Sequence, residues 1–209
     1  MVHQLYFARP AAAAISVFIN EIHYDNTGTD AGEAIEVAGP AGTNLAGWSI
    51  VLYNGADGAP YDTKSLSGII PNQAAGFGTL HFTYGTNGIQ NGTPDGIALV
   101  NGTTVVQFLS YEGTAFTAVG GPANGMLSVN IGVAETGSEP LGQSLRLTGP
   151  GQFYEDFTWN APATASFGAI NTGQNFGAGD AAPTVLTTVP TTGATNVAVD
   201  TNITITFSE

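Results

Sequence analysis

Four segments of the chain alternate apolar and polar residues with a period of two, which is typical of half-buried β-strands. They are "GWSIVLY" (47–53), "GTLHFTYG" (78–85), "QSLRLTG" (143–149) and "NITITF" (202–207). Less regular alternation predicts four more strands, in "VFINEIHY" (17–24), "EAIEV" (33–37), "GIALV" (96–100) and "TTVVQFLSYEG" (103–113). Apolar residues stand on both faces of "TVVQFL" (104–109), so we expect both faces of that strand to be covered.

Turn signals separate these predicted strands. They are "YNGADG" (53–58), "TNGIQNGTPDG" (86–96), "VNGTT" (100–104) and "GGPANG" (120–125). Asn-Gly and Asp-Gly pairs favour the positive φ angles of tight turns. No segment combines a 3.6-residue apolar period with helix caps. The pattern therefore predicts an all-β protein, an antiparallel β-sandwich or barrel.

Charge narrows the classes of function. The chain has 3 Lys and Arg residues against 16 Asp and Glu residues, and its formal net charge is −13. Because nucleic-acid binding requires several basic side chains, we expect no direct contact with nucleic acid. The absence of cysteine excludes thiolate metal sites and cysteine nucleophiles. No apolar run is long enough to span a bilayer, and the acidic, lysine-poor composition is typical of secreted bacterial modules.

A change in composition at "FGAGDAAPT" (176–184) predicts a domain boundary. We expect residues 1–16 to be either disordered or the remnant of a signal peptide, and residues 17–176 to form the β-sandwich. Residues 177–182 would be a linker. Residues 183–209 are too few to bury a core alone, so we expect them to begin a further domain of a longer multidomain protein.

Residues 17–176 resemble a lamin tail domain of the bacterial secreted kind. The resemblance rests on "VFINEIHYDNTGTDAGEAIEV" (17–37), the Gly-Trp strand "NLAGWSIVLYNG" (44–55), "LSGIIPNQAAGFGTLHF" (66–82) and "TPDGIALVNGTTVVQFLSYEG" (93–113). Downstream, "GPANGMLSVNIGV" (121–133) and "SFGAINTGQ" (166–174) are similar to the extended bacterial version. "PTVLTTVPTTGATNVAVDTNITITFSE" (183–209) resembles the start of a bacterial Ig-like domain.

These resemblances imply an immunoglobulin-like antiparallel β-sandwich followed by an incomplete second Ig-like domain. They also imply a non-catalytic accessory module, for scaffolding, attachment or binding, in a larger exported bacterial protein that is secreted or on the cell surface. Its partners would be adjacent domains of that protein, and a surface polymer or carbohydrate. Two alternatives stay open: an accessory domain that contributes to an extracellular nuclease or phosphoesterase, and a carbohydrate-binding module.

An acidic stretch near the start, "INEIHYDNTGTDAGEAIEVAGPAG" (19–42), is the strongest candidate for chemistry because it places carboxylates beside His23. A metal-dependent hydrolase would need further histidines, and the others are His3 and His81. The sequence shows no nucleophile elbow, zinc-protease motif or phosphate loop. We therefore expect no enzyme activity, and we expect His23 and His81 to be exposed on their strands.

Calcium is the candidate cofactor of the same stretch. Asp25, Asp30 and Glu33 offer hard oxygen ligands within one Gly-containing loop, although the EF-hand spacing is absent. The alternative is an acidic turn whose side chains bond its own backbone while their charges stay solvated. Glu21 and Glu36 lie within predicted strands, where we expect them to face solvent or to pair with Arg146 or Lys64.

The aromatic residues allow two interpretations. We expect Trp48 and Trp159 to belong to the core. Tyrosines at strand ends and in loops could stack on sugars or could close the ends of the sandwich; they are Tyr24, Tyr53, Tyr61, Tyr84, Tyr111 and Tyr154.

Overall fold

The structure, a computed structural model, describes residues 14–177, 185–191, 193–198 and 200–207. The chain divides into two compact units, residues 1–179 and residues 180–209.

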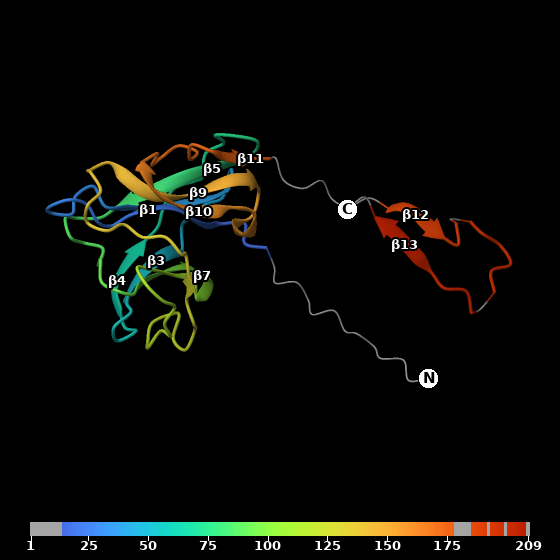
Figure 1. The fold of residues 1–209 in the computed structure, drawn as a ribbon, viewed down its shortest axis with the longest axis horizontal. Helices are drawn as coiled ribbons and strands as arrows, with labels where there is room; N and C mark the ends of the chain where they lie inside the picture. The colour runs from blue at the N-terminus through green and yellow to red at the C-terminus, as the bar shows by residue number, and fades with distance from the viewer. Residues whose placement is uncertain (1–13, 178–184, 192, 199, 208–209) are drawn as a thin grey trace. The chain divides into compact units, whose positions relative to one another are not determined.

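The first unit consists of two β-sheets that face each other (Figure 1). Sheet one has the strand order β10 (Thr158–Thr164), β9 (Gln143–Gly151), β1 (Phe18–His23), β2 (Ala34–Pro40) and β5 (Phe77–Thr83), and β11 (Gln174–Phe176) pairs with β9. Sheet two has the order β4 (Pro60–Ser65), β3 (Trp48–Asn54), β6 (Asp95–Asn101), β7 (Thr104–Tyr111) and β8 (Val129–Asn130). A short 3₁₀ turn, η1 (Tyr154–Asp156), precedes β10. The pairs are antiparallel except for β7 with β8 and β9 with β11.

The main core fills the space between the inner faces of the sheets. Alternate residues of β1 and β2, such as Ile22 and Ile35, belong to the same buried cluster as Ile50, Leu52 and Ile97 of sheet two. Each large apolar side chain buried in this way stabilises the fold by about 1.5–3 kcal/mol. The structure therefore confirms the predicted immunoglobulin-like antiparallel β-sandwich.

All eight strands predicted from the sequence are present. The sequence missed β4, β8, β10 and β11 of the first unit and β12 of the second. Trp159 is buried and Trp48 is half-buried against the core, which confirms the prediction for both. Upstream of β1, Ile15 packs on the core, and its carbonyl accepts a hydrogen bond from Tyr154 N (2.9 Å).

The outer face of sheet two carries a second apolar cluster. It consists of Val51, Tyr53, Ala98, Val100, Phe108, Ala118 and Ala123. The Tyr53 hydroxyl fixes the covering loop by accepting a hydrogen bond from the Ala123 amide (2.9 Å). β7 is thus covered on both faces, as its two-sided apolar pattern predicts.

The outer face of sheet one carries a polar layer instead. Glu21 and Glu36 lie on this face, and each is fully buried. The prediction that they face solvent or pair with Arg146 or Lys64 is therefore wrong. The physical reason is that residues 165–177 cross this face and bond both carboxylates through backbone and side-chain donors.

The second unit, as far as the structure describes it, is an antiparallel hairpin of β12 (Val185–Val189) and β13 (Thr204–Phe207). Val185, Leu186, Ile203 and Ile205 are exposed on it. No helix in the described part of the chain has the length and apolar character needed to cross a membrane.

Candidate functional site

The middle of the acidic stretch, residues 24–33, forms the connection between β1 and β2 at one end of the sandwich. Its backbone is shaped by two side chains. Asp30 Oδ1 accepts a hydrogen bond from Asn26 N (3.1 Å), and Asn26 Oδ1 accepts one from Ala31 N (2.9 Å). Asp30 Oδ2 also accepts a hydrogen bond from Asn91 Nδ2 (3.2 Å), which ties the connection to the loop before β6.

Glu33, at the end of the acidic connection, is bonded to the loop that follows β5. It is fully buried, and its two oxygens accept hydrogen bonds from the backbone amides of Gly88 (2.6 Å) and Ile89 (2.9 Å). Burial raises the pKa of Glu33, although both amide bonds act in the opposite direction. The role that the structure gives this carboxylate is to fix the loop that follows β5.

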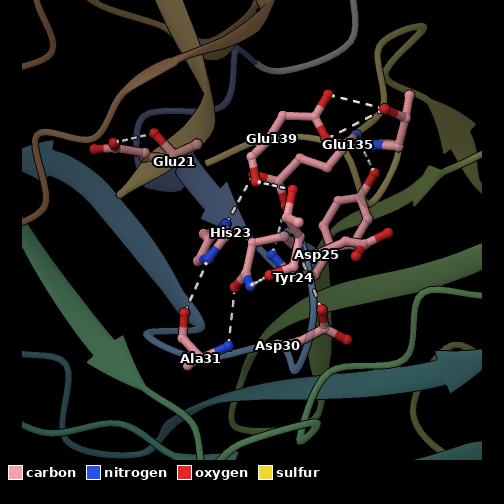
Figure 2. A network of polar contacts seen from close by, with 12 residues as sticks. Glu21, His23, Tyr24, Asp25, Asp30, Ala31, Glu135 and Glu139 are labelled. Carbon is pink, nitrogen blue, oxygen red and sulfur yellow. Dashed lines mark hydrogen bonds and ion pairs between the residues drawn. The ribbon is translucent and has the colours of Figure 1, made fainter. Parts of the chain in front are cut away.

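His23 is buried, so the prediction of an exposed histidine is wrong for this residue. Its Nδ1 lies 2.9 Å from Glu135 Oε1, because the segment between β8 and β9 folds over the end of β1 (Figure 2). His81 is exposed, as predicted.

The contacts of His23 define its protonation state. Nδ1 faces a carboxylate, and Nε2 faces the carbonyl oxygen of Ala31 at 3.2 Å. Both partners are acceptors, so both ring nitrogens must carry a proton to satisfy them. Burial lowers the pKa of His23, but the hydrogen bond and charge of Glu135 outweigh this effect and raise the pKa above its ordinary value. While His23 is protonated, the pair is a buried imidazolium–carboxylate ion pair.

Glu135 also organises the start of the acidic connection. Its Oε2 accepts hydrogen bonds from Tyr24 N (2.7 Å) and Asp25 N (2.9 Å), and its own amide donates to the Tyr24 hydroxyl (2.7 Å). The Tyr24 ring packs against Tyr111, with the centroids 4.4 Å apart. The sequence analysis did not select Glu135, because it lies 112 residues from His23 and no motif connects the two.

An open cleft of about 440 Å³ lies beside this network. Eight residues line it, and none is a lysine or arginine: Asp25, Asn91, Thr93, Glu112, Gly113, Ala134, Glu135 and Thr136. Burial raises the pKa of Asp25, and the neighbouring carboxyl of Asp30 raises it further. Burial, together with the charge of Asp25, raises the pKa of Glu112 to about 7. The cleft thus brings several carboxyl groups together, and their mutual repulsion favours the binding of a proton or a cation.

The candidate calcium ligands are only partly brought together. Asp25 and Asp30 are neighbours, whereas the Glu33 carboxylate is bonded to two amides. The part of the chain that the structure describes contains no group of three or more His, Asp or Glu residues placed to hold a metal ion. Calcium binding stays a prediction.

The tyrosines proposed for sugar stacking are turned inward. Tyr24, Tyr53 and Tyr111 are buried, and Tyr61, Tyr84 and Tyr154 are half-buried. Several of their hydroxyls hold loops: Tyr61 accepts a hydrogen bond from Gln90 N (2.8 Å), and Tyr111 donates one to Gln90 O (2.7 Å). Tyr61 and Tyr111 thereby hold the loop before β6 at the acidic end, whereas Tyr53 belongs to the cluster on the outer face of sheet two and Tyr154 packs against Phe18.

Fold and site together define an all-β, immunoglobulin-like protein with an acidic end. Residues 179–209 match the family model of a bacterial Ig-like domain. No curated protein and no solved structure matches the chain.

Proposed function

We propose that residues 17–176 are a non-catalytic accessory module, similar to a lamin tail domain, in a larger exported bacterial protein. The module would be secreted or on the cell surface, and it would serve scaffolding, attachment or binding. Adjacent domains of the same protein would be its first partners.

One observation carries this proposal. The groups that a hydrolase would use at the acidic end are bonded within the fold. His23 has both ring nitrogens engaged, Glu135 accepts two amides besides the histidine, and Glu33 accepts two more. Because a general base or metal ligand needs an available lone pair, these residues are suited to holding loops.

The neighbouring sequence supports an accessory role. A match to a bacterial Ig-like domain directly follows the sandwich in the chain. The module would then be one of several β-domains joined in series, and its own surface would supply attachment or binding.

Localisation and activity together test the proposal. Fractionation of the native cells, with an antibody against the chain, should recover the protein from the medium or the envelope. The purified chain should not hydrolyse bis-p-nitrophenyl phosphate or DNA with calcium, magnesium or zinc present. Recovery from the cytosol, or hydrolysis that Asp25→Asn with Glu112→Gln abolishes, would refute it.

A calcium-binding role is the second candidate, and the contact between Asp25 and Asp30 favours it. Two carboxyl groups in contact cannot both be ionised without a cost. A bound proton or a bound cation relieves that cost, and the open cleft gives a cation access. The calcium titration described in the Discussion separates the two outcomes.

A further inference from the structure

Residues 165–177, called the strap here, are the last residues of the first unit that the structure describes. The strap leaves β10 at Thr164, crosses the outer face of sheet one and ends with β11. Asn171 holds the middle of the strap against sheet one, because the Asn171 Nδ2 donates hydrogen bonds to Asn20 O (3.2 Å) and to Leu147 O (3.0 Å). Gln174 Nε2 donates to Asn20 Oδ1 (2.7 Å) near the end.

Two buried carboxylates hold the first half of the strap. Glu21 Oε1 accepts hydrogen bonds from Ser166 N (2.7 Å) and Ser144 Oγ (2.5 Å), and its Oε2 accepts one from Ser166 Oγ (3.1 Å). Glu36 Oε2 accepts a hydrogen bond from Gly168 N (2.6 Å), and its Oε1 accepts one from Asn20 Nδ2 (2.9 Å). Both residues are fully buried.

The register explains why these side chains meet. The pairing of β1 with β2 shifts between Ile19 and Glu21, at a bulge that leaves Asn20 without a paired partner. Glu21 is then directly opposite Glu36 on the neighbouring strand. Like charges in such a position repel each other.

The surroundings offer little compensating charge. Burial raises the pKa of Glu21, and the charge of Arg146, opposite it on β9, only partly opposes this shift. The Arg146 Nη1 donates to Thr164 O. On β5, His81 is opposite Glu36, and it is exposed. Within the described part of the chain, the ion pair that the geometry shows is His23 with Glu135. Two carboxyl groups therefore share one buried layer without a cation bonded to either.

We propose that the strap is a pH-dependent latch: it stays closed on sheet one while Glu36 is uncharged, and it opens more readily when Glu36 ionises. Opening would let water reach the carboxylate and separate it from Glu21.

The direction of the pH effect follows from the folded-state environment. Burial, reinforced by the charge of Glu21, raises the pKa of Glu36 from 4.5 to about 8, against the hydrogen bonds from Asn20 and Gly168. The closed state therefore binds a proton more tightly than the open state. The stability that the raised pKa of Glu36 gives to the closed state, relative to the open state, is complete below about pH 4.5. It declines as the pH rises and is lost above about pH 8. The equilibrium between closed and open strap changes by at most about three-thousandfold over this range.

Hydrogen–deuterium exchange of the full chain, followed by mass spectrometry between pH 5 and pH 9, tests the latch. After correction for the intrinsic exchange rate, peptides that cover residues 165–177 should open more as the pH rises and reach a plateau above about pH 8. Peptides from β6 in the centre of sheet two serve as the internal control and should show no such rise.

Two variants assign the effect to one group. Glu36→Gln cannot ionise and should remove the pH dependence, whereas His81→Asn, on the opposite strand, should retain it. Equal protection of the strap at every pH, or an unchanged slope in Glu36→Gln, would overturn the proposal. If Glu36→Gln does not fold, the carboxyl ¹³C shift of Glu36 in the unaltered chain decides. A midpoint near 8 supports the latch, and a midpoint near 4.5 refutes it.

Discussion

The buried ion pair between His23 and Glu135 predicts a pH-dependent loss of stability in Glu135→Gln. The amide oxygen of the glutamine can still accept the hydrogen bonds from the Tyr24 and Asp25 amides. Its amide nitrogen would then face His23 Nδ1 as a donor. That contact is satisfied only if His23 is neutral and keeps its remaining proton on Nε2, toward Ala31 O.

The expected magnitude follows from the interaction that is lost. Two unit charges about 4 Å apart attract by about 4 kcal/mol at the effective dielectric constant of a partly buried site. The variant keeps its shape and its other hydrogen bonds, so the loss should approach the net value of one charged hydrogen bond, about 1.5–3 kcal/mol.

The sign of the pH dependence is also fixed. The pKa of His23 is raised above 6.5 in the folded chain, so its contribution is fully present below pH 6.5 and is lost as the pH rises through the folded-state value. Without the Glu135 charge, burial lowers that pKa. The stability difference between the two proteins should therefore be largest below pH 6.5 and should shrink as the pH rises through the folded-state pKa of His23.

Urea unfolding followed by tryptophan fluorescence, at several values between pH 5.5 and 9, measures this difference. Long-range ¹H–¹⁵N spectra of the histidines show whether His23 carries one proton or two. The matched control is His81→Gln, which alters an exposed histidine and should change stability by less than about 0.5 kcal/mol. A difference that is the same at every pH, or a single ring proton on His23 in the unaltered chain at pH 6, would refute the reasoning.

Three further predictions concern the loops. If Asp25 and Asp30 bind calcium, millimolar calcium should raise the thermal midpoint, and Asp25→Asn with Asp30→Asn should abolish the rise; no shift in the unaltered chain would end the hypothesis. Tyr53→Phe leaves the buried Ala123 amide without its acceptor, so urea unfolding should show a loss of about 1–3 kcal/mol, whereas a neutral result would mean that the loop repacks. Gly58→Ala places a Cβ 2.6 Å from Thr117 O at a residue with φ of 75°, and a loss of more than about 1 kcal/mol should follow in the same assay.

The strands could be predicted where the alternation of apolar and polar residues coincided with burial of the apolar face. Ile50 and Leu52, for example, face the main core, as the pattern of their strand requires. β4 was not predicted because it is an edge strand whose residues, among them Asp62 and Thr63, are mostly exposed and lack apolar alternation. β8 is two residues long, which is too short for any periodic signal.

The candidate site was less predictable for a different reason. Alternation identifies the two faces of a strand, but it does not reveal whether a loop covers the polar face. Glu21 and Glu36 are on the face that the pattern assigns to polar residues, yet the strap buries them. His23 was assigned to solvent on the same reasoning, and its partner Glu135 comes from a distant segment.

The carboxylates of this chain follow one physical rule that its composition imposes. With 16 acidic residues and 3 Lys and Arg residues, most carboxylates cannot find a cationic side chain. Those that the fold buries accept backbone N–H groups of loops instead, which are the other strong donors available. The donors are amides that lie outside regular strand pairing: Gly55 and Gly92 to Asp95, Gly88 and Ile89 to Glu33, Ser166 to Glu21, Gly168 to Glu36, and Tyr24 and Asp25 to Glu135. A carboxylate used in this way orders a loop that has no secondary structure of its own. For Glu36, burial raises the pKa and so couples its ionisation to the opening of the strap. The acidic composition thus has a structural explanation that requires no catalytic site, and it makes pH the solution variable to which the loops should respond most strongly.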